Sequence, residues 1–429
     1  MRRFDAKDPA FHEAFRAFVE ERRETPEEVD AVVRDVIAAV RAEGLPALLR
    51  FALEFDKVAL DETSIRVSTD EIERGAADCA PAVREAIAFA AERIRAYHER
   101  QRPADQRFTD AAGVELGWRW TPLDAVGVYV PGGRAAYPST VLMNAVPAAV
   151  AGVGRISMVT PPGKLQPAVL AAAKTAGITE IWRVGGAQAV AALAYGAGPI
   201  APVDKIVGPG NAFVTAAKRR VYGAVGIDAL AGPSEIVVVA DGANDPDWIA
   251  ADLLSQAEHD PAAQSILITD DPDFAQRVEA AVEAQLSTLT TGKDAAASWR
   301  DHGAIVIAPL GTAPELVDLI APEHVEFAVA DPDSLAARVR HAGAMFLGRH
   351  APEAIGDYVA GSNHVLPTSR AARFSSGLSL YDFLKRTSIV KCDEAAFARL
   401  APATVALAEA EGLPAHARSA AIRMGQTKR

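Results

Sequence analysis

Hydrophobic and polar positions follow different periods in different parts of the chain. Over residues 8–54 and again over 83–100, apolar residues recur at helical spacing, and Thr25 followed by Pro26 is a typical helix start. From Val114 onward, short apolar runs bounded by glycines alternate with alanine-rich helical stretches. The first part is therefore predicted to be largely helical, and the centre to alternate between strands and helices.

Two series of alternating strands and helices are predicted after Val114. The first has strands at 126–130, 156–159, 181–184 and 205–207, followed by helices at 139–151, 167–176, 187–195 and 211–221. The second has strands at 236–239, 266–269, 304–307, 325–329 and 344–347, with helices at 246–258, 272–285, 313–320 and 333–341. Such alternation is typical of parallel, doubly wound α/β sheets. The prediction is two α/β units joined near Gly232-Pro233, followed by a mixed region with helices at 395–410 and after Pro414.

Composition and charge narrow the class of protein. Half of the 429 residues are hydrophobic, 23% are charged and the mean hydropathy is +0.07, so the chain can fill sizeable cores. A net charge of −12 favours no nucleic-acid partner. The most apolar stretch, 141–153, is too short and too interrupted to cross a membrane, and the N-terminus has no signal-peptide core. Two cysteines, Cys79 and Cys392, form no disulfide framework, so a reducing, cytoplasmic compartment is expected.

Glycine-rich turns follow three of the predicted strands, although no GxGxxG motif opens a helix after a strand. The turns are 130–133, Gly185-Gly186 and 208–211. Glycines let a backbone turn sharply and approach a ligand, and the helix starts that follow can meet a phosphate group. Each turn taken alone is most simply a tight strand–helix connection. Three of them at one sheet edge make a nucleotide-like ligand plausible.

Several polar residues have the chemistry of metal ligands. Gln256 and His259 are three residues apart near a predicted helix end, Asp357 follows the last predicted α/β strand, and His416 lies in the tail. Two imidazoles, a carboxylate and an amide oxygen would suit Zn²⁺. Their spacing matches no standard metal motif, so spacing alone favours ordinary surface or satisfied polar residues over a metal site.

Two further motifs are candidates for proton transfer and for substrate contact. Glu323 and His324 lie between a predicted helix and a predicted strand, where they could share the work of a base. The simpler alternative is a histidine favoured by the helix C-terminus. Ser234 opens a strand within a turn and lacks the pattern of a nucleophile elbow.

Taken together, these segments resemble the histidinol dehydrogenase family. The resemblance covers nearly the whole chain, and its motifs occur in order at 127–133, 137–148, 185–196, 203–214, 226–235, 251–260, 321–327, 356–369, 372–386 and 411–419. It implies an NAD-dependent enzyme with one Zn²⁺ per subunit. Such an enzyme oxidises L-histidinol through L-histidinaldehyde to L-histidine, in the last steps of histidine biosynthesis.

The resemblance also implies roles for individual residues. The zinc ligands would be Gln256, His259, Asp357 and His416. His324 would take the proton of the substrate hydroxyl, and Glu323 would activate the water that hydrates the aldehyde. Ser234 and Glu411 would contact the substrate together with His324 and the zinc ligands, and Tyr129, Gln188 and Asn211 would contact NAD. These three NAD residues fall in or beside the glycine-rich turns.

The predicted organisation is that of a homodimer built from two incomplete Rossmann-like domains with parallel sheets. The boundaries are a helical arm at 1–22, a discontinuous α/β domain at 23–120 and 236–370 carrying the zinc and catalytic residues, an NAD-binding domain at 121–235, and a C-terminal tail at 371–429. The tail would reach the partner subunit, so that Glu411 and His416 complete the partner's site.

Small departures from the family pattern and two other functions bear on this prediction. Val325 and Phe327 replace the commoner leucines, and Ser362 varies a Gly-Pro-Asn motif; such exchanges tune substrate fit by about 1 kcal/mol. A relative that oxidises another small alcohol, such as a sulfonated diol, would keep the zinc set and change the substrate contacts. A zinc hydrolase is disfavoured by the NAD-type turns and by the missing HExxH motif. A scaffold without activity is disfavoured by the intact Glu323 and His324.

Overall fold

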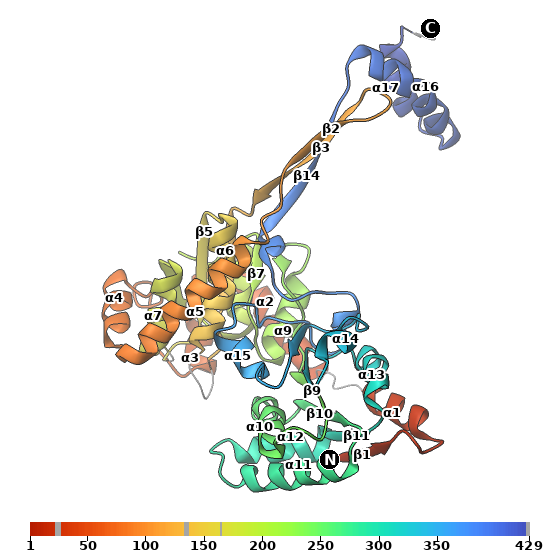
Figure 1. Ribbon diagram of the computed structural model, residues 1–429. Coiled ribbons are helices and arrows are strands. Elements are labelled where there is room, and N and C mark those ends of the chain that lie inside the picture. Colours follow the sequence, from red (N-terminus) through yellow and green to blue (C-terminus); the bar gives the residue numbers. More distant parts are fainter. Residues whose placement is uncertain (22–26, 133–136, 164, 426–429) are drawn as a thin grey trace. The chain divides into compact units, whose positions relative to one another are not determined.

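The chain divides into two compact units in the computed structural model, which describes residues 1–21, 27–132, 137–163 and 165–425 (Figure 1). Unit 1 comprises Met1–Gln101 and Leu123–Phe383, and unit 2 comprises Arg102–Pro122 and Leu384–Arg429. The helix start predicted at Thr25-Pro26, and Gly133 of the first glycine-rich turn, lie outside the described residues.

Unit 1 contains a first parallel sheet of five strands in the order β6-β5-β4-β7-β8. The strands are β4 (Ala125–Tyr129), β5 (Arg155–Thr160), β6 (Glu180–Arg183), β7 (Lys205–Val207) and β8 (Gly226–Ile227). The chain runs outward from β4 to β6 and then crosses back to β7 on the other side of β4. The order therefore reverses between β4 and β7, the position at which open α/β sheets bind ligands at their carboxyl ends.

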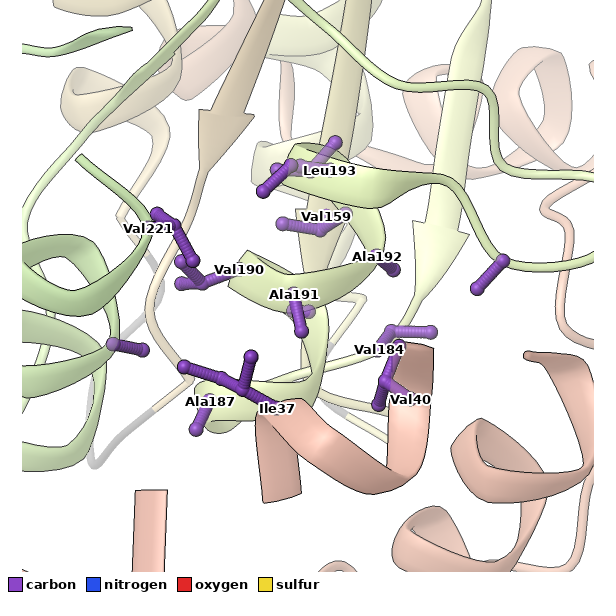
Figure 2. Close-up of a cluster of buried hydrophobic side chains, with 14 of the residues drawn as sticks. Ile37, Val40, Val159, Val184, Ala187, Val190, Ala191, Ala192, Leu193 and Val221 are labelled. Carbon is purple, nitrogen blue, oxygen red and sulfur yellow. The ribbon is translucent and has the colours of Figure 1, made fainter. Parts of the chain in front are cut away.

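Eight helices of unit 1 accompany this sheet. Four share one apolar core with it: α2 (Glu27–Glu43), α3 (Leu45–Phe55), α8 (Gly186–Tyr195) and α9 (Ala212–Val221). Figure 2 shows Ile37 of α2 beside Ala187 and Ala191 of α8, where the small alanine side chains let the helices approach closely, and Val40 of α2 beside Val184. The other four pack with one another: α4 (Thr69–Asp78), α5 (Pro81–Glu99), α6 (Pro138–Ala151) and α7 (Pro167–Ala176).

A second parallel sheet in unit 1 has six strands in the order β1-β11-β10-β9-β12-β13. They are β1 (Arg2–Asp5), β9 (Glu235–Ala240), β10 (Gln264–Thr269), β11 (Ala304–Ile307), β12 (His324–Ala328) and β13 (Ala344–Leu347). Alternate residues face opposite cores: Val237 and Ile266 pack on one side, Val238 and Leu267 on the other. Both faces of the inner strands are covered, which explains why strands such as β9 and β11 are almost wholly apolar.

Helices cover both faces of the second sheet. The core on one face includes α1 (Phe11–Glu20) and α13 (Ala313–Ile320), and the core on the other includes α10 (Pro246–Ala257), α11 (Pro272–Leu286) and α12 (Gly292–His302). Shorter helical segments are α14 (Pro332–Ala336), α15 (Glu353–Tyr358), η1 (Leu310–Thr312), η2 (Ala371–Arg373) and η3 (Leu380–Phe383). Among the described residues, no helix is both long and apolar enough to span a membrane.

Unit 2 is an antiparallel sheet with two helices. Its strands are β2 (Gln106–Thr109), β3 (Glu115–Pro122) and β14 (Leu384–Lys391), and its helices are α16 (Glu394–Ala410) and α17 (Pro414–Arg423). β3 lies between β2 and β14, and Figure 1 shows the long pairing of β3 with β14. Segments far apart in the sequence thus form one unit.

The predicted fold class, parallel α/β sheets with a helical tail, is confirmed. The predicted domain boundaries differ from the packing in several places. Arg102–Pro122 forms unit 2 with the tail, and residues 371–383 belong to unit 1. The helices α2 and α3 share the core of the first sheet, whereas the boundaries assigned 23–120 to the second. Strand β1, within the predicted helical arm, pairs with β11 at the edge of the second sheet.

Candidate functional site

The residues predicted to do the chemistry meet at the amino edge of the second sheet. Ser234 immediately precedes β9, and Glu323 immediately precedes β12, which begins at His324. Because β9 and β12 are adjacent and parallel, their first residues lie side by side. The Glu323 Oε2 atom accepts the Glu235 backbone N–H at 3.1 Å, and His324 Nδ1 lies 3.1 Å from the Glu235 carbonyl oxygen. The backbone of one strand therefore orients the two side chains of the other.

The hydrogen bond of His324 determines which of its nitrogens can act as a base. A carbonyl oxygen can only accept, so Nδ1 carries the proton and Nε2 carries the lone pair. The His324 side chain is buried, and its Nε2 finds no hydrogen-bond partner among the described residues. Burial lowers the pKa of His324 to about 3, helped by the neighbouring His259 and His364. The imidazole is therefore neutral at pH 7, with an uncommitted basic nitrogen.

Two carboxyl groups from α15 face this nitrogen. His324 Nε2 lies 3.7 Å from Glu353 Oε1 and 3.9 Å from Asp357 Oδ1. Glu353 and Asp357 are four residues apart and so share one helix face. Burial raises the pKa of Glu353 to about 8 and that of Asp357 to about 6; the Asp357 carboxylate adds to the rise at Glu353. The three side chains offer donor atoms within 4.8 Å of one another, a group able to hold a metal ion.

Gln256 and His259 lie at the end of α10. The Gln256 amide nitrogen lies 2.8 Å from His259 Nδ1, and Gln256 is completely buried. Its amide oxygen is buried without a hydrogen-bond partner within the described parts of the chain. An unpaired buried oxygen costs free energy unless something else binds it. Gln256 Oε1 is therefore available to a ligand such as a metal ion.

Sequence reasoning missed the carboxyl groups behind the site. Glu326 lies two residues after His324 in β12, accepts the backbone N–H of Glu353 and hydrogen-bonds with Asp252 of α10. Burial raises the pKa of Glu326 well above its ordinary value and that of Asp252 to about 6. These contacts join α10, β12 and α15, the elements that carry Gln256, His324 and Asp357. A glutamate inside an apolar strand, EHVEFAV, is the signal that could have found Glu326.

His364 and Glu353 were also absent from the predicted site. His364 Nδ1 lies 3.0 Å from the Asp357 carbonyl oxygen, and burial lowers the pKa of His364 to about 4. Glu353 is 2% exposed, and its Oε2 accepts the Ser255 hydroxyl at 3.2 Å. The spacing of four residues places Glu353 on the same helix face as Asp357, and this spacing could have predicted Glu353 as a site residue.

The two tail residues of the predicted site belong to unit 2. Glu411 directly follows α16, and His416 lies in the first turn of α17. Each unit is described by itself, so the residues that unit 1 brings together are Ser234, Gln256, His259, Glu323, His324 and Asp357. The predicted contribution of Glu411 and His416 stays a prediction.

The predicted NAD contacts lie around the carboxyl edge of the first sheet. Tyr129 ends β4, Asn211 precedes α9 in the turn after β7, and Gln188 lies in the first turn of α8. The Tyr129 hydroxyl accepts the Gly186 N–H at 3.0 Å, and the Asn211 side chain accepts the N–H groups of Phe213 and Val214. Asn211 is exposed, whereas Tyr129 and Gln188 are each only 3% exposed. The turns after β4 and β7 flank the point where the strand order reverses.

Comparison with known proteins gives a consistent picture. The family model described as histidinol dehydrogenase matches residues 19–424. The chain is 76% identical over 424 residues to a histidinol dehydrogenase of Caulobacter vibrioides, covering 99% of each chain. It is 61% identical over 428 residues to that of Rhodospirillum rubrum, again covering 99% of each. A crystal structure of histidinol dehydrogenase from Elizabethkingia anophelis superposes with a TM-score of 0.94 at 35% identity, covering 99% of this chain and 98% of the other.

Proposed function

The chain belongs to the histidinol dehydrogenase family of oxidoreductases, and we propose that it is a zinc-containing enzyme that oxidises L-histidinol through L-histidinaldehyde to L-histidine with two NAD⁺. One observation carries the proposal. His324, a buried neutral imidazole with a free Nε2, stands beside Glu323 and faces Asp357. A base that stays unprotonated at neutral pH is what the oxidation of an alcohol requires.

Proton removal is the task of His324. Oxidation of the alcohol breaks a C–H bond and an O–H bond; the hydride leaves the carbon, and His324 Nε2 takes the hydroxyl proton. Glu323 then takes a proton from the water that adds to the aldehyde, and its pKa, raised by burial, makes it a stronger base than an ordinary carboxylate. As the water adds, His324 Nε2 returns the first proton to the aldehyde oxygen and Glu323 later releases its proton to solvent, so His324 is neutral again and takes the hydroxyl proton of the hydrated aldehyde in the second oxidation. Each oxidation thus releases one proton and one hydride.

The chemistry of the donor set supports a zinc site. Gln256 Oε1 lacks any other partner within the described residues, and His259 and Asp357 supply an imidazole and a carboxylate nearby. We assign Gln256, His259 and Asp357, with His416 from the tail, as the residues that would hold Zn²⁺. When bound, zinc would orient the substrate through its nitrogen atoms. Of the donor group His324, Glu353 and Asp357, only Asp357 is assigned to the ion, because a base must keep its lone pair.

The cofactor would bind at the carboxyl edge of the first sheet. Tyr129, Gln188 and Asn211 are proposed as its contacts, and NAD⁺ would accept the hydride. The strand order reverses between β4 and β7, and turns rich in glycine follow both strands, which supports a nucleotide ligand here. The exposed Asn211 amide can reach a ligand while its oxygen still caps α9.

Substrate contacts and assembly complete the proposal. Ser234 and Glu411 would contact the substrate along with the residues already assigned, and the Glu411 carboxylate would meet its ammonium group. We propose a homodimer in which Glu411 and His416 enter the site of the partner. Both residues lie in unit 2, a compact unit distinct from the one that carries the other site residues, which supports this arrangement.

The test is the amount of NADH formed when limiting L-histidinol is exhausted, with and without a chelator. Two NADH per L-histidinol, lost on chelation and restored by Zn²⁺, is the expected result. One NADH with released aldehyde would exclude the second step. No NADH from L-histidinol, together with NADH from a sulfonated diol, would support the relative that acts on another alcohol.

A further inference from the structure

Gly208 packs closely against the end of β4, the neighbour of β7 in the first sheet. It follows β7 directly and has a φ of +110°, a conformation that favours glycine. A Cβ atom at this position would lie 2.2 Å from the carbonyl oxygen of Tyr129, the last residue of β4. The turn of residues 208–211 is therefore pressed against the end of β4, where the strand order reverses.

A buried ion pair holds both backbone groups of Gly208. The Gly208 N–H donates to Asp228 Oδ2 at 2.7 Å, and Lys218 Nζ donates to the Gly208 carbonyl oxygen at 2.6 Å. Lys218 Nζ also donates to Asp228 Oδ1 at 2.5 Å, which closes the ring of contacts. The side chains of Lys218 and Asp228 are only 3% and 5% exposed. These two residues come from α9 and from the segment after β8, so three separate pieces of chain meet at one glycine.

This arrangement does more than fill space. Removing two charges from water is costly, and well-packed apolar side chains of the same size are often at least as stabilising as a buried ion pair. The ion pair instead fixes the orientation of the N–H and carbonyl groups of Gly208, which lies beyond the hydrogen-bonded residues of β7. The contact between Gly208 and Tyr129 extends this order to the next turn, since the Tyr129 hydroxyl accepts the Gly186 N–H.

We propose that Lys218 and Asp228 are positioning residues of the NAD⁺ site, which hold the 208–211 turn in its binding conformation before the cofactor arrives. The inference rests on the proposed function, because it takes the cofactor to bind at the turns after β4 and β7. Lys218 and Asp228 are too buried to touch the cofactor. Their effect passes through Gly208 to Asn211, three residues further along the turn. Because the turn is already ordered, NAD⁺ binding does not carry the entropic cost of ordering it.

The test uses the full-length variants Asp228→Asn and Lys218→Met. Asp228→Asn keeps one oxygen acceptor and loses the charge, whereas Lys218→Met keeps the approximate length of the side chain and loses its donors. We expect both to raise the Kd and the KM for NAD⁺ at least tenfold, while the KM for L-histidinol and the zinc content stay within twofold of the wild type. A purely structural role would lower thermal stability without separating the two substrates in this way.

Lys205→Met is the matched control. Lys205 begins the same strand, β7, at its opposite end, and its Nζ donates to Asp382 Oδ1 at 2.8 Å and to the Asp382 carbonyl oxygen at 3.0 Å. Its loss should lower stability and leave the affinity for NAD⁺ unchanged. An equal loss of NAD⁺ affinity in this control would overturn the positioning role.

Hydrogen exchange of the wild type tests the same idea without any variant. The Gly208 amide should exchange slowly before NAD⁺ is added, because its N–H already donates to the buried Asp228 carboxylate. Exchange that is fast without NAD⁺ and slow with it would overturn the proposal, as would unchanged NAD⁺ affinity in folded variants. Failure of the wild type itself to bind NAD⁺ would instead overturn the proposed function.

Discussion

Replacing Gly356 by alanine tests whether the spacing between β13 and α15 sets the geometry of the site. Gly356 lies in α15 between Glu353 and Asp357, and a Cβ added to it would lie 2.3 Å from Cε1 and 2.7 Å from Cζ of Phe346 in β13. Carbon atoms in contact are about 3.5–4.0 Å apart, so the overlap is roughly 1.5 Å. Either the Phe346 ring or α15 has to move by about this distance.

Movement of either the Phe346 ring or α15 would displace groups that surround His324. The Phe346 ring centroid lies 6.1 Å from that of His324, and α15 carries the carboxyl groups that face His324 Nε2. A misplacement of about 1 Å at reacting groups can reduce the rate about 100-fold. Overpacking costs about 1–3 kcal/mol, and the gain of about 1 kcal/mol from replacing glycine in a helix offsets part of it. Gly356→Ala is therefore expected to lose far more activity than stability.

The assay compares kcat, zinc content and thermal unfolding in wild type, Gly356→Ala and Gly311→Ala. Gly311 is the control, because no atom lies within 4 Å of a Cβ added there. We expect kcat of Gly356→Ala to fall at least tenfold, kcat of Gly311→Ala to stay unchanged, and Phe346→Leu to restore part of the activity in a double variant. A wild-type kcat in Gly356→Ala would refute the argument that this spacing controls the site.

Three further predictions address the metal, the pH dependence and the core. Gln256→Ala and Asp357→Asn should each weaken zinc retention at least tenfold in a competition with a chelator, and wild-type retention in both would contradict the assigned ligands. Because the pKa of His324 falls from 6.5 to about 3 on folding, the unfolded state binds more protons at this group between these values, so the contribution of His324 to the stability of metal-free protein should fall as pH falls from 6.5 toward 3. His324→Gln should flatten this dependence in chemical unfolding, and parallel pH curves would contradict the assigned burial. Phe274 is a fully buried core residue of α11, so Phe274→Ala should lower the free energy of unfolding in denaturant by about 3–5 kcal/mol and leave the KM values unchanged. A decrease below about 1 kcal/mol would contradict the packing.

The parallel sheets could be predicted because their strands are buried on both faces. Runs such as residues 236–240 and Ala304–Ile307 are wholly apolar, and glycines or helix starts mark the ends of these strands. Strand β1, with the sequence RRFD, has no such pattern, because it is a mostly exposed edge strand whose partner β11 lies about 300 residues away. Strands β2 and β14 of unit 2 are also largely polar and exposed, so only their pairing with β3 reveals them.

The candidate site was only partly predictable for a related reason. Glu323, His324 and Asp357 stand in recognisable motifs, but Glu326 and Asp252 acquire their importance from burial and from each other. Their contact joins a strand and a helix that lie about 70 residues apart in the sequence. The packing of α2 and α3 on the first sheet depends in the same way on the alanine-rich surface of α8, which no local pattern of those helices specifies.

The central claim is that His324 takes the hydroxyl proton in two successive oxidations and that Glu323 activates the water that adds between them. The most direct test is the number of NADH formed per L-histidinol by Glu323→Gln, with hydrazine present to trap any aldehyde. Glutamine keeps an oxygen that can accept the Glu235 N–H, so the site should stay folded. The account predicts two NADH per L-histidinol from the wild type without the trap, and one NADH with trapped L-histidinaldehyde from Glu323→Gln. Two NADH from Glu323→Gln at the wild-type rate would contradict it.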